Sequence, residues 1–178
     1  RFENGPPKFP AIELGRLTDR GIRESKIIDF EKLCIKKGKK VWTVFIDIYP
    51  INDDGNLMDA AGIGALVALK TARMPKYDEK NEKVVYGEIT DKKIPLAKHI
   101  PLPITAHKIG KSLIVDPTLE EEDVSEARVT IGSTPDGVIS SIQKGNSREI
   151  TTEEMYKILE LTEKTRKKVF SKIEKFLK

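Results

Sequence analysis

The run Val41 to Tyr49 limits, more than any other feature, the folds that this sequence can adopt. It is rich in β-branched and aromatic residues, and apolar residues occupy both its odd and its even positions. Successive side chains of a strand point to opposite faces of a sheet, so such a run predicts a central strand covered on both sides. The sequence therefore predicts a sheet with packed layers against both of its faces.

Helices are predicted where apolar residues recur at helical spacing. The first of three such segments, at about 11–27, follows a stretch rich in proline and glycine. Its residues Leu14, Leu17 and Gly21 fall on one face of a helix. The second segment is apolar and small nearly all round, which suits a helix packed deep between layers, and we expect Pro75 to end it. The predicted helices span about 11–27, 57–72 and 151–177.

Strands and turns account for most of the remaining chain. We expect Asp29 to cap a short helical turn at 30–33, and the charged segment 76–83 is predicted to be mobile. Strand-like runs, with hairpin turns at Gly110-Lys111 and 134–137, lie at 84–89, 104–115, 127–131 and 138–143. Helices and strands are mixed without a visible long repeat, which predicts an α+β fold.

Composition narrows the class of protein without choosing one function. The chain has 178 residues, and its formal net charge of +4 is compatible with a polyanionic partner but far from that of a DNA-packing protein. Cys34 is the only cysteine, and His99 and His107 are the only histidines, so we expect neither a disulfide nor a metal or other cofactor. The single cysteine and the lack of a membrane-spanning apolar run predict a soluble protein of the reducing cytoplasm, with no membrane partner.

Three arginines form a row on the first predicted helix. Arg16, Arg20 and Arg23 fall within a narrow stripe on the side away from its apolar residues. Guanidinium groups bind phosphates bidentately and so suit a nucleic-acid backbone. Asp19 and Glu24 lie at pairing distance on the same helix and could neutralise the row. On the residues alone, a solvated and self-paired face is the favoured interpretation.

Carboxylates gather at Asp116 and 120–123, just beyond the strand that we expect to end at Val115. They could build a metal or general-acid site, but an acidic first helical turn is the favoured interpretation because negative charge suits the helix dipole. Asp47 and Asp59 lie in apolar surroundings, where a carboxylate needs a partner and more often holds structure together than reacts. The sequence contains no Walker loop, dinucleotide fingerprint or nucleophile elbow.

Five separated segments share a pattern with one known family. In chain order they are Ala11-Ile12-Glu13-Leu14, Asp19-Arg20-Gly21-Ile22-Arg23-Glu24-Ser25, Trp42 to Ile48, Asp54-Gly55-Asn56-Leu57-Met58-Asp59-Ala60 and Ile142-Gln143-Lys144. Together they resemble the RNase PH-like subunits of the archaeal exosome, and specifically the non-catalytic member of the pair. The resemblance runs through essentially all of residues 1–178 as a single domain, with the family's N-terminal strands missing before Arg1.

The resemblance implies both a fold and an assembly. The implied fold is an α+β domain of two similar β-rich halves with packed helices, like ribosomal protein S5 domain 2. Such subunits alternate with catalytic RNase PH-like partners in a hetero-hexameric ring, three of each, that works with RNA-binding cap subunits. A central channel admits single-stranded RNA, which the assembly degrades from the 3′ end by phosphorolysis.

Two departures from the catalytic members bear on activity. Where those members carry a Gly-Thr-Arg type element for the attacking phosphate, this chain has Leu57-Met58 within Asp54 to Ala60, so the resemblance implies that the phosphate clamp is absent. Catalytic members also carry two aspartates six residues apart after a later strand, and here Asp116 is followed at that spacing by Glu122. The first carboxylate is retained, but its partner differs.

The resemblance reverses the interpretation of the arginine row. Arg16, Arg20 and Arg23 match the family segment whose arginines face RNA, and Arg23 ranks last because it is better placed to pair with Asp19. The sequence therefore predicts a non-catalytic ring subunit that completes the partner's active site and helps to bind RNA. The alternative is an active phosphate-dependent 3′–5′ exoribonuclease.

Overall fold

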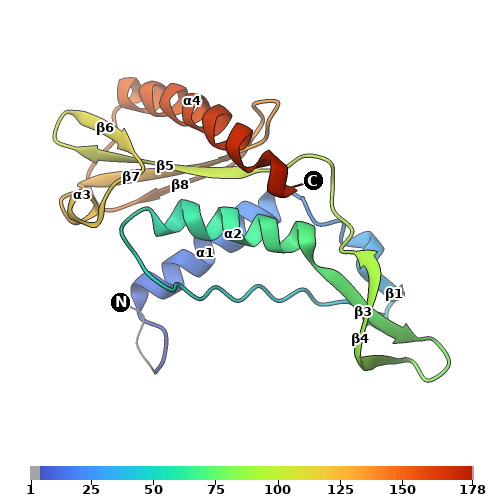
Figure 1. Ribbon diagram of the computed structural model, residues 1–178. Helices are drawn as coiled ribbons and strands as arrows, with labels where there is room; N and C mark the ends of the chain where they lie inside the picture. The colour runs from blue at the N-terminus through green and yellow to red at the C-terminus, as the bar shows by residue number, and fades with distance from the viewer. Residues whose placement is uncertain (1–4, 178) are drawn as a thin grey trace.

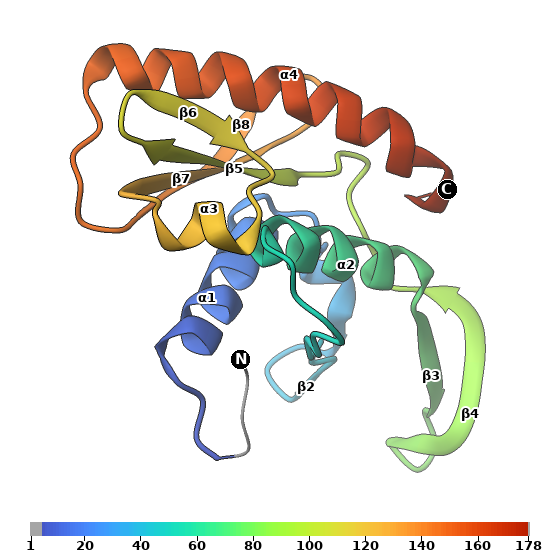
Figure 2. The same cartoon turned by 60° about the vertical axis from the view of Figure 1, so that its left-hand side comes forward.

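A four-stranded antiparallel sheet is the centre of the computed structural model, which describes residues 5–177. The long helix α4 lies on one face of this sheet, and α1 and α2 lie on the other, as Figure 1 and Figure 2 show. The predicted α+β fold class is confirmed. The strands, in their order across the sheet, are β6 (Ser112–Val115), β5 (Leu102–Ile109), β7 (Ala127–Ser133) and β8 (Ile139–Gly145).

Each of the three predicted helices is present, with small shifts at its ends. The helices are α1 (Phe9–Glu24), α2 (Leu57–Thr71) and α4 (Thr152–Leu177). Pro10 lies in the first turn of α1, where its missing N–H is not needed. The same helix ends before the predicted limit because the Ser25 hydroxyl donates to the Ile22 carbonyl at 2.7 Å and Lys26 adopts a left-handed φ of 54°.

Two hydrophobic clusters hold the layers together. The first joins α1, α2 and the chain around Ile27 to the start of β5, and it includes Leu66 and Leu102. The second packs α4 onto the sheet through Ile158 and Ile131. Helix α2 approaches β5 so closely that a Cβ at Gly62 would collide with the ring of Pro103. The predicted small-residue helix is therefore present and packs closely on β5, but it is not enclosed between layers, because Ala60, Gly64 and Ala68 form an exposed stripe along it.

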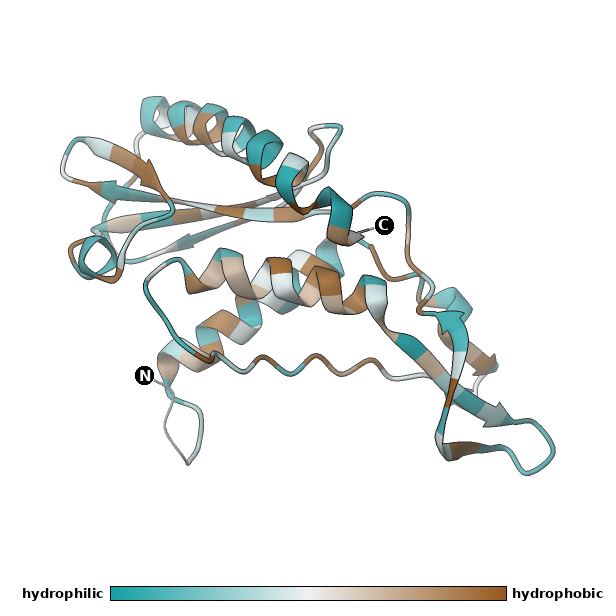
Figure 3. Cartoon of the chain, in the orientation of Figure 1, coloured by the Kyte–Doolittle hydropathy of each residue, from teal (hydrophilic) through white to brown (hydrophobic). Residues whose placement is uncertain are grey.

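The predicted central strand Val41 to Tyr49 is wrong. Only its first residue belongs to a strand, β2 (Lys40–Val41), which pairs with β1 (Cys34–Lys36) after the short turn η1 (Glu31–Leu33). The remainder is extended, and within the described chain it has no strand partner. Phe45 and Tyr49 are each 83% exposed, while the alternate residues Trp42, Val44 and Ile46 are half-buried against the core. Figure 3 shows how much of this extended segment is hydrophobic.

The charged segment 76–83, where no strand was predicted, is part of a two-stranded ribbon. Strands β3 (Arg73–Asp78) and β4 (Lys83–Lys93) pair antiparallel and project from the body of the molecule (Figure 1). An exposed ion pair of 2.6 Å between Lys76 and Glu88 joins the two strands, and the Asp78 carboxylate accepts two backbone N–H groups in the turn. No helix of the described chain is long and apolar enough to cross a membrane.

Candidate nucleic-acid interface

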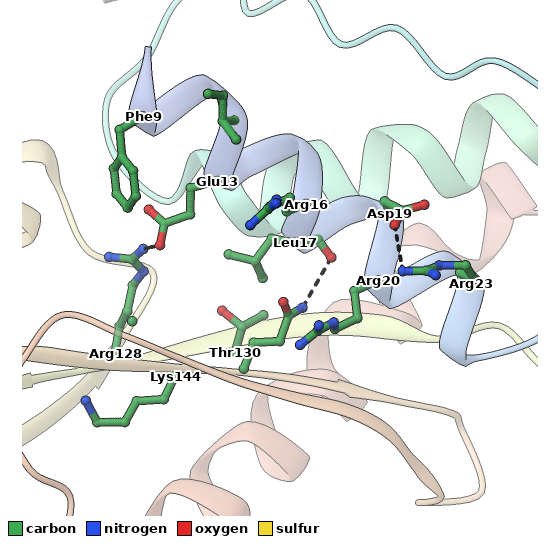
Figure 4. Close-up of a pocket in the computed structure, with 13 residues that line it drawn as sticks. Phe9, Glu13, Arg16, Leu17, Asp19, Arg20, Arg23, Arg128, Thr130 and Lys144 are labelled. Carbon is green, nitrogen blue, oxygen red and sulfur yellow. Dashed lines mark hydrogen bonds and ion pairs between the residues drawn. The ribbon is translucent and has the colours of Figure 1, made fainter. Parts of the chain in front are cut away.

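A groove of about 700 Å³ separates α1 from strands β7 and β8 (Figure 4). Five of the side chains along it are basic and two are acidic, so the groove is positively charged. Its basic residues come from two elements that are far apart in the sequence, the first helix and the central sheet. The groove is lined by Phe9, Ile12, Glu13, Arg16, Leu17, Asp19, Arg20, Arg23, Arg128, Thr130, Gln143, Lys144 and Gly145.

The arginine row forms the helical wall of this groove. Arg16, Arg20 and Arg23 are exposed on α1, on the opposite side from its buried residues. Arg23 forms an ion pair of 3.1 Å with Asp19, as the sequence predicted. Glu24 forms no ion pair with the row, and Arg16 and Arg20 have no acidic partner among residues 5–177. The interpretation that acidic residues of the same helix neutralise the row is therefore wrong for Arg16 and Arg20.

The sheet forms the opposite wall, and the sequence analysis did not identify its basic residues as part of the site. Arg128 of β7 is largely buried, forms an ion pair with Glu13 of α1 and donates to the Asn146 side chain at 2.7 Å. The Lys144 ammonium of β8 donates to the Asn146 carbonyl at 2.8 Å. A side chain at Gly145, the cross-strand neighbour of Arg128, would meet the guanidinium group.

Side chains two residues apart on a strand point to the same face, so the sequence could have placed Arg128 and Thr130 of β7 on one face of the sheet. The same pattern does not indicate which helix covers that face. The side-chain amide of Gln143, on the neighbouring strand, donates to the Leu17 carbonyl at 3.4 Å and so joins the two walls directly. The pairing of α1 with this edge of the sheet is therefore visible only in the structure.

Two of the carboxylates at 116–123, Asp116 and Glu122, lie at the start of α2 and do not line the groove. The Glu122 carboxylate accepts the backbone N–H of Asn56 at 2.9 Å, and the Asn56 side chain donates to Asp116 at 2.8 Å. Burial raises the pKa of Glu122 above its ordinary value. A carboxylate of this chain therefore occupies the amino end of α2, where free N–H groups and the helix dipole would otherwise attract an anion.

The acidic segment also confirms the simpler interpretation made from its sequence. Residues Leu119–Asp123 form the short helix α3, and Thr118 and Glu121 close a reciprocal capping box at its start. Asp116 precedes it in a left-handed conformation, with φ of 58°. No cluster of His, Cys, Asp or Glu in the described part of the chain could hold a metal ion.

Asp59 and Asp47 have opposite surroundings. Asp59 is buried in α2, and its carboxylate accepts the backbone N–H of Thr105 at 3.0 Å and the Thr105 hydroxyl at 2.7 Å. Burial raises the pKa of Asp59 to about 6. This carboxylate ties α2 to β5, as expected of a structural residue. Asp47, in contrast, is exposed on the extended segment and needs no partner.

Both histidines make contacts that hold structure together. His107 is buried on β5 beside the Ser125 hydroxyl, at 3.1 Å from its Nδ1 atom. Burial, reinforced by the charge of Arg128, lowers the pKa of His107 to about 4, so the ring is neutral at pH 7. His99 lies 2.5 Å from the Ser25 carbonyl through its Nε2 atom and so fixes the chain after α1.

Two family models match successive parts of the chain. They are domain 1 of the 3′ exoribonuclease family, over residues 1–75, and domain 2 of the same family, over residues 99–165. These two matches include both the arginine-bearing helix and the sheet that faces it. The chain belongs to the 3′ exoribonuclease, or RNase PH, family.

Relatives and solved structures agree with this family. "Exosome complex component Rrp42" of Methanocella arvoryzae is 43% identical over 173 residues, which are 97% of this chain and 64% of the relative. The protein of the same name from Pyrococcus horikoshii is 46% identical, over 98% of this chain and 65% of the relative. An Archaeoglobus fulgidus exosome "with RNA bound to the active site" matches with a TM-score of 0.84 and 35% identity, over 97% of this chain and 65% of that chain. The chain thus spans less than two thirds of the length of these relatives.

Proposed function

We propose that this chain is part of a non-catalytic subunit of an archaeal exosome ring, and that it binds single-stranded RNA in the groove between α1 and β8. The main observation behind this proposal is that Arg16 and Arg20 line the groove without an acidic partner among the described residues. Exposed guanidinium groups suit a phosphate backbone, which is the constant feature of RNA. The names of the similar proteins and the likeness to an exosome structure with bound RNA support the same assignment.

The amino end of α2 supports a non-catalytic role. Phosphorolysis needs inorganic phosphate held beside the scissile bond, usually by a cationic group or by helix N–H groups. Here Leu57-Met58 supplies no cation, and Glu122 already accepts the Asn56 N–H. A second anion would be repelled by Glu122 and by Asp116 beside it. The subunit would instead complete the active site of its catalytic partner.

Exposed apolar side chains support a ring with other subunits. Phe45, Tyr49 and Ile51 on the extended segment and Tyr86 on the ribbon are almost fully exposed. Surfaces of this kind are typical of protein interfaces rather than of free monomers. We assign them to contacts within a cytoplasmic assembly that contains a catalytic RNase PH-like partner, three copies of each, and RNA-binding cap subunits.

Changing Arg16 and Arg20 together to alanine in the full-length protein, assembled with its partners, tests RNA binding. Each arginine that contacts a phosphate releases about one counterion, so the double variant should flatten the salt dependence of RNA affinity by about one to two units of slope. The loss should be the same for all RNA sequences, because phosphates carry no sequence information. Affinity measured at several salt concentrations gives the slope.

A matched control removes two positive charges elsewhere. Lys168→Ala with Lys172→Ala acts on α4, across the sheet from the groove, and should leave the slope unchanged. Equal slopes for both double variants and the parent protein would contradict the proposal. If the chain itself released nucleoside diphosphates from RNA and phosphate, and Asp116→Ala abolished that reaction, the active exoribonuclease would be the correct function.

A further inference from the structure

Two exposed apolar side chains, Phe9 and Ile12, lie at one end of the groove between α1 and the sheet. Phe9, the first residue of α1, is 73% exposed, and Ile12, one turn later, is 45% exposed. Both line the same groove as Arg16 and Arg20. Figure 4 shows the Phe9 ring pointing from α1 toward the sheet, beside the Glu13–Arg128 ion pair. The groove therefore combines a bare aromatic face with free cationic groups, which a site for simple anions does not need.

The helix places the ring and the arginines in one line. At about 100° per residue, Phe9, Arg16 and Arg20 fall within a stripe about 40° wide along α1. The helical rise separates Phe9 from Arg16 by about 10 Å, which is the length of about three stacked nucleotides. A single strand that follows the arginines along α1 therefore reaches Phe9 within a few nucleotides.

Resting on the proposed function, we propose that Phe9 is a stacking platform for one unpaired base of the RNA strand whose phosphates contact Arg16 and Arg20. An aromatic ring stacks on any base, because every base has a π-face, whereas phosphates offer nothing for the ring to bind. Phe9 carries no hydrogen-bonding group, so it contributes affinity without sequence preference. Ile12 covers the edge of the same base.

The charge next to the ring fits this assignment. Glu13 is the acidic residue nearest to Phe9 in the chain, and it would repel a phosphate if it were free. Its carboxylate is instead held by Arg128, whose guanidinium group reaches across the groove from β7. The floor beneath the proposed base is therefore a neutral ion pair. Positive charge without an acidic partner among the described residues lies farther along α1, at Arg16 and Arg20, and on the sheet wall at Lys144.

Phe9→Ala in the full-length protein, within the intact complex, separates stacking from charge. We expect affinity for an oligoadenylate to fall about tenfold, the size of one lost base–aromatic stack, with the salt slope unchanged. Phe9→Trp should restore affinity. Inorganic polyphosphate, which has the charge of RNA but no bases, should bind the parent and Phe9→Ala proteins equally. Tyr156→Ala, an exposed aromatic on α4 with 65% exposure, is the matched control and should change neither affinity.

Three results would overturn the stacking platform. One is an unchanged oligoadenylate affinity in Phe9→Ala. Another is an equal loss of polyphosphate binding, which would make Phe9 a general determinant of the groove's shape. The third is dissociation of the complex, which would make Phe9 a protein contact. If RNA affinity of the Arg16/Arg20 double variant has the same salt dependence as that of the parent protein, the proposed function itself fails. RNA then does not bind in the groove, whatever the effect of Phe9→Ala.

Discussion

Strands β5 to β8, which α4 covers, contain strand-forming residues similar to those of the extended segment after Val41 and of the ribbon β3–β4. The two regions nevertheless differ in structure. Strands β5 to β8 form one continuous ladder with helices on both faces, and the centre of β7 is fully buried. The extended segment after Val41 has no strand partner among residues 5–177, and β3 pairs only with β4. Apolar and β-branched composition thus favours an extended backbone, but a sheet also needs a neighbouring strand to complete its hydrogen bonds.

The largest expected effect comes from truncating a buried side chain of the sheet, in comparison with an exposed side chain of the extended segment. In the 178-residue chain, Ile131→Ala should lower the free energy of unfolding by about 4 kcal/mol, because Ile131 is 2% exposed and packs beneath α4. Phe45→Ala should change it by less than about 0.5 kcal/mol, since that ring is exposed. Urea unfolding of both variants measures the difference. Equal losses would mean that the extended segment is covered in solution.

Acid titration extends the comparison, because the pKa values of a buried carboxylate that contacts the sheet, Asp59 of α2, and of an exposed one on the ribbon, Glu82, shift in opposite directions. Burial raises the pKa of Asp59 to about 6, so the folded state holds this proton more tightly than the unfolded chain does. Its contribution to stability is present below about pH 4 and is lost as the pH rises to about 6, by about 3 kcal/mol at most. On the ribbon turn, Lys40 and Lys36 lower the pKa of Glu82, whose stabilising contribution is lost as the pH falls through that lowered value.

Comparing the parent chain with Asp59→Asn and Glu82→Gln between about pH 3 and 7 isolates the two contributions. The difference in unfolding free energy between the parent and Asp59→Asn should change between about pH 4 and 6. The Glu82→Gln difference should change only at lower pH. A flat Asp59→Asn difference would show that this carboxylate titrates as an ordinary exposed group.

The smallest expected effect concerns local contacts at the surface of each region. The Thr151 hydroxyl accepts the backbone N–H of Glu154 at the start of α4, and Thr151→Ala should cost about 1 kcal/mol. Lys76→Ala breaks the exposed ion pair with Glu88 on the ribbon and should leave the unfolding midpoint unchanged. Thermal unfolding of the two variants provides the comparison. A larger loss for Lys76→Ala would show that the ribbon is stabilised mainly by its charges.

Sequence patterns predicted the local elements well where both partners of a contact lie close together in the chain. The hairpin turns at Gly110-Lys111 and 134–137 lie between strands that pair directly with each other, and both were predicted. The run Val41 to Tyr49 failed because its composition does not reveal whether a neighbouring strand is present. The strand β3 was missed at the start of segment 76–83, because a run of charged residues shows no strand periodicity, whereas Lys76 and Asp78 belong to a hairpin.

The site was predictable only in part, for a related reason. The arginine stripe depends on spacing within one helix, so Arg16, Arg20 and Arg23 could be placed on one exposed face. The opposite wall depends on which sheet edge lies against that helix. Arg128 follows Arg16 by more than a hundred residues, and nothing local in either segment indicates that they face one groove.

Two bonds across the groove, Gln143 to the Leu17 carbonyl and Arg128 to Glu13, have a consequence for how a strand would bind. They hold α1 at a fixed separation from the sheet before any ligand arrives. The groove is thus preorganised, and the conformational entropy of its walls is lost during folding rather than during binding. The flexible partner, the single strand, would carry most of the ordering cost on association.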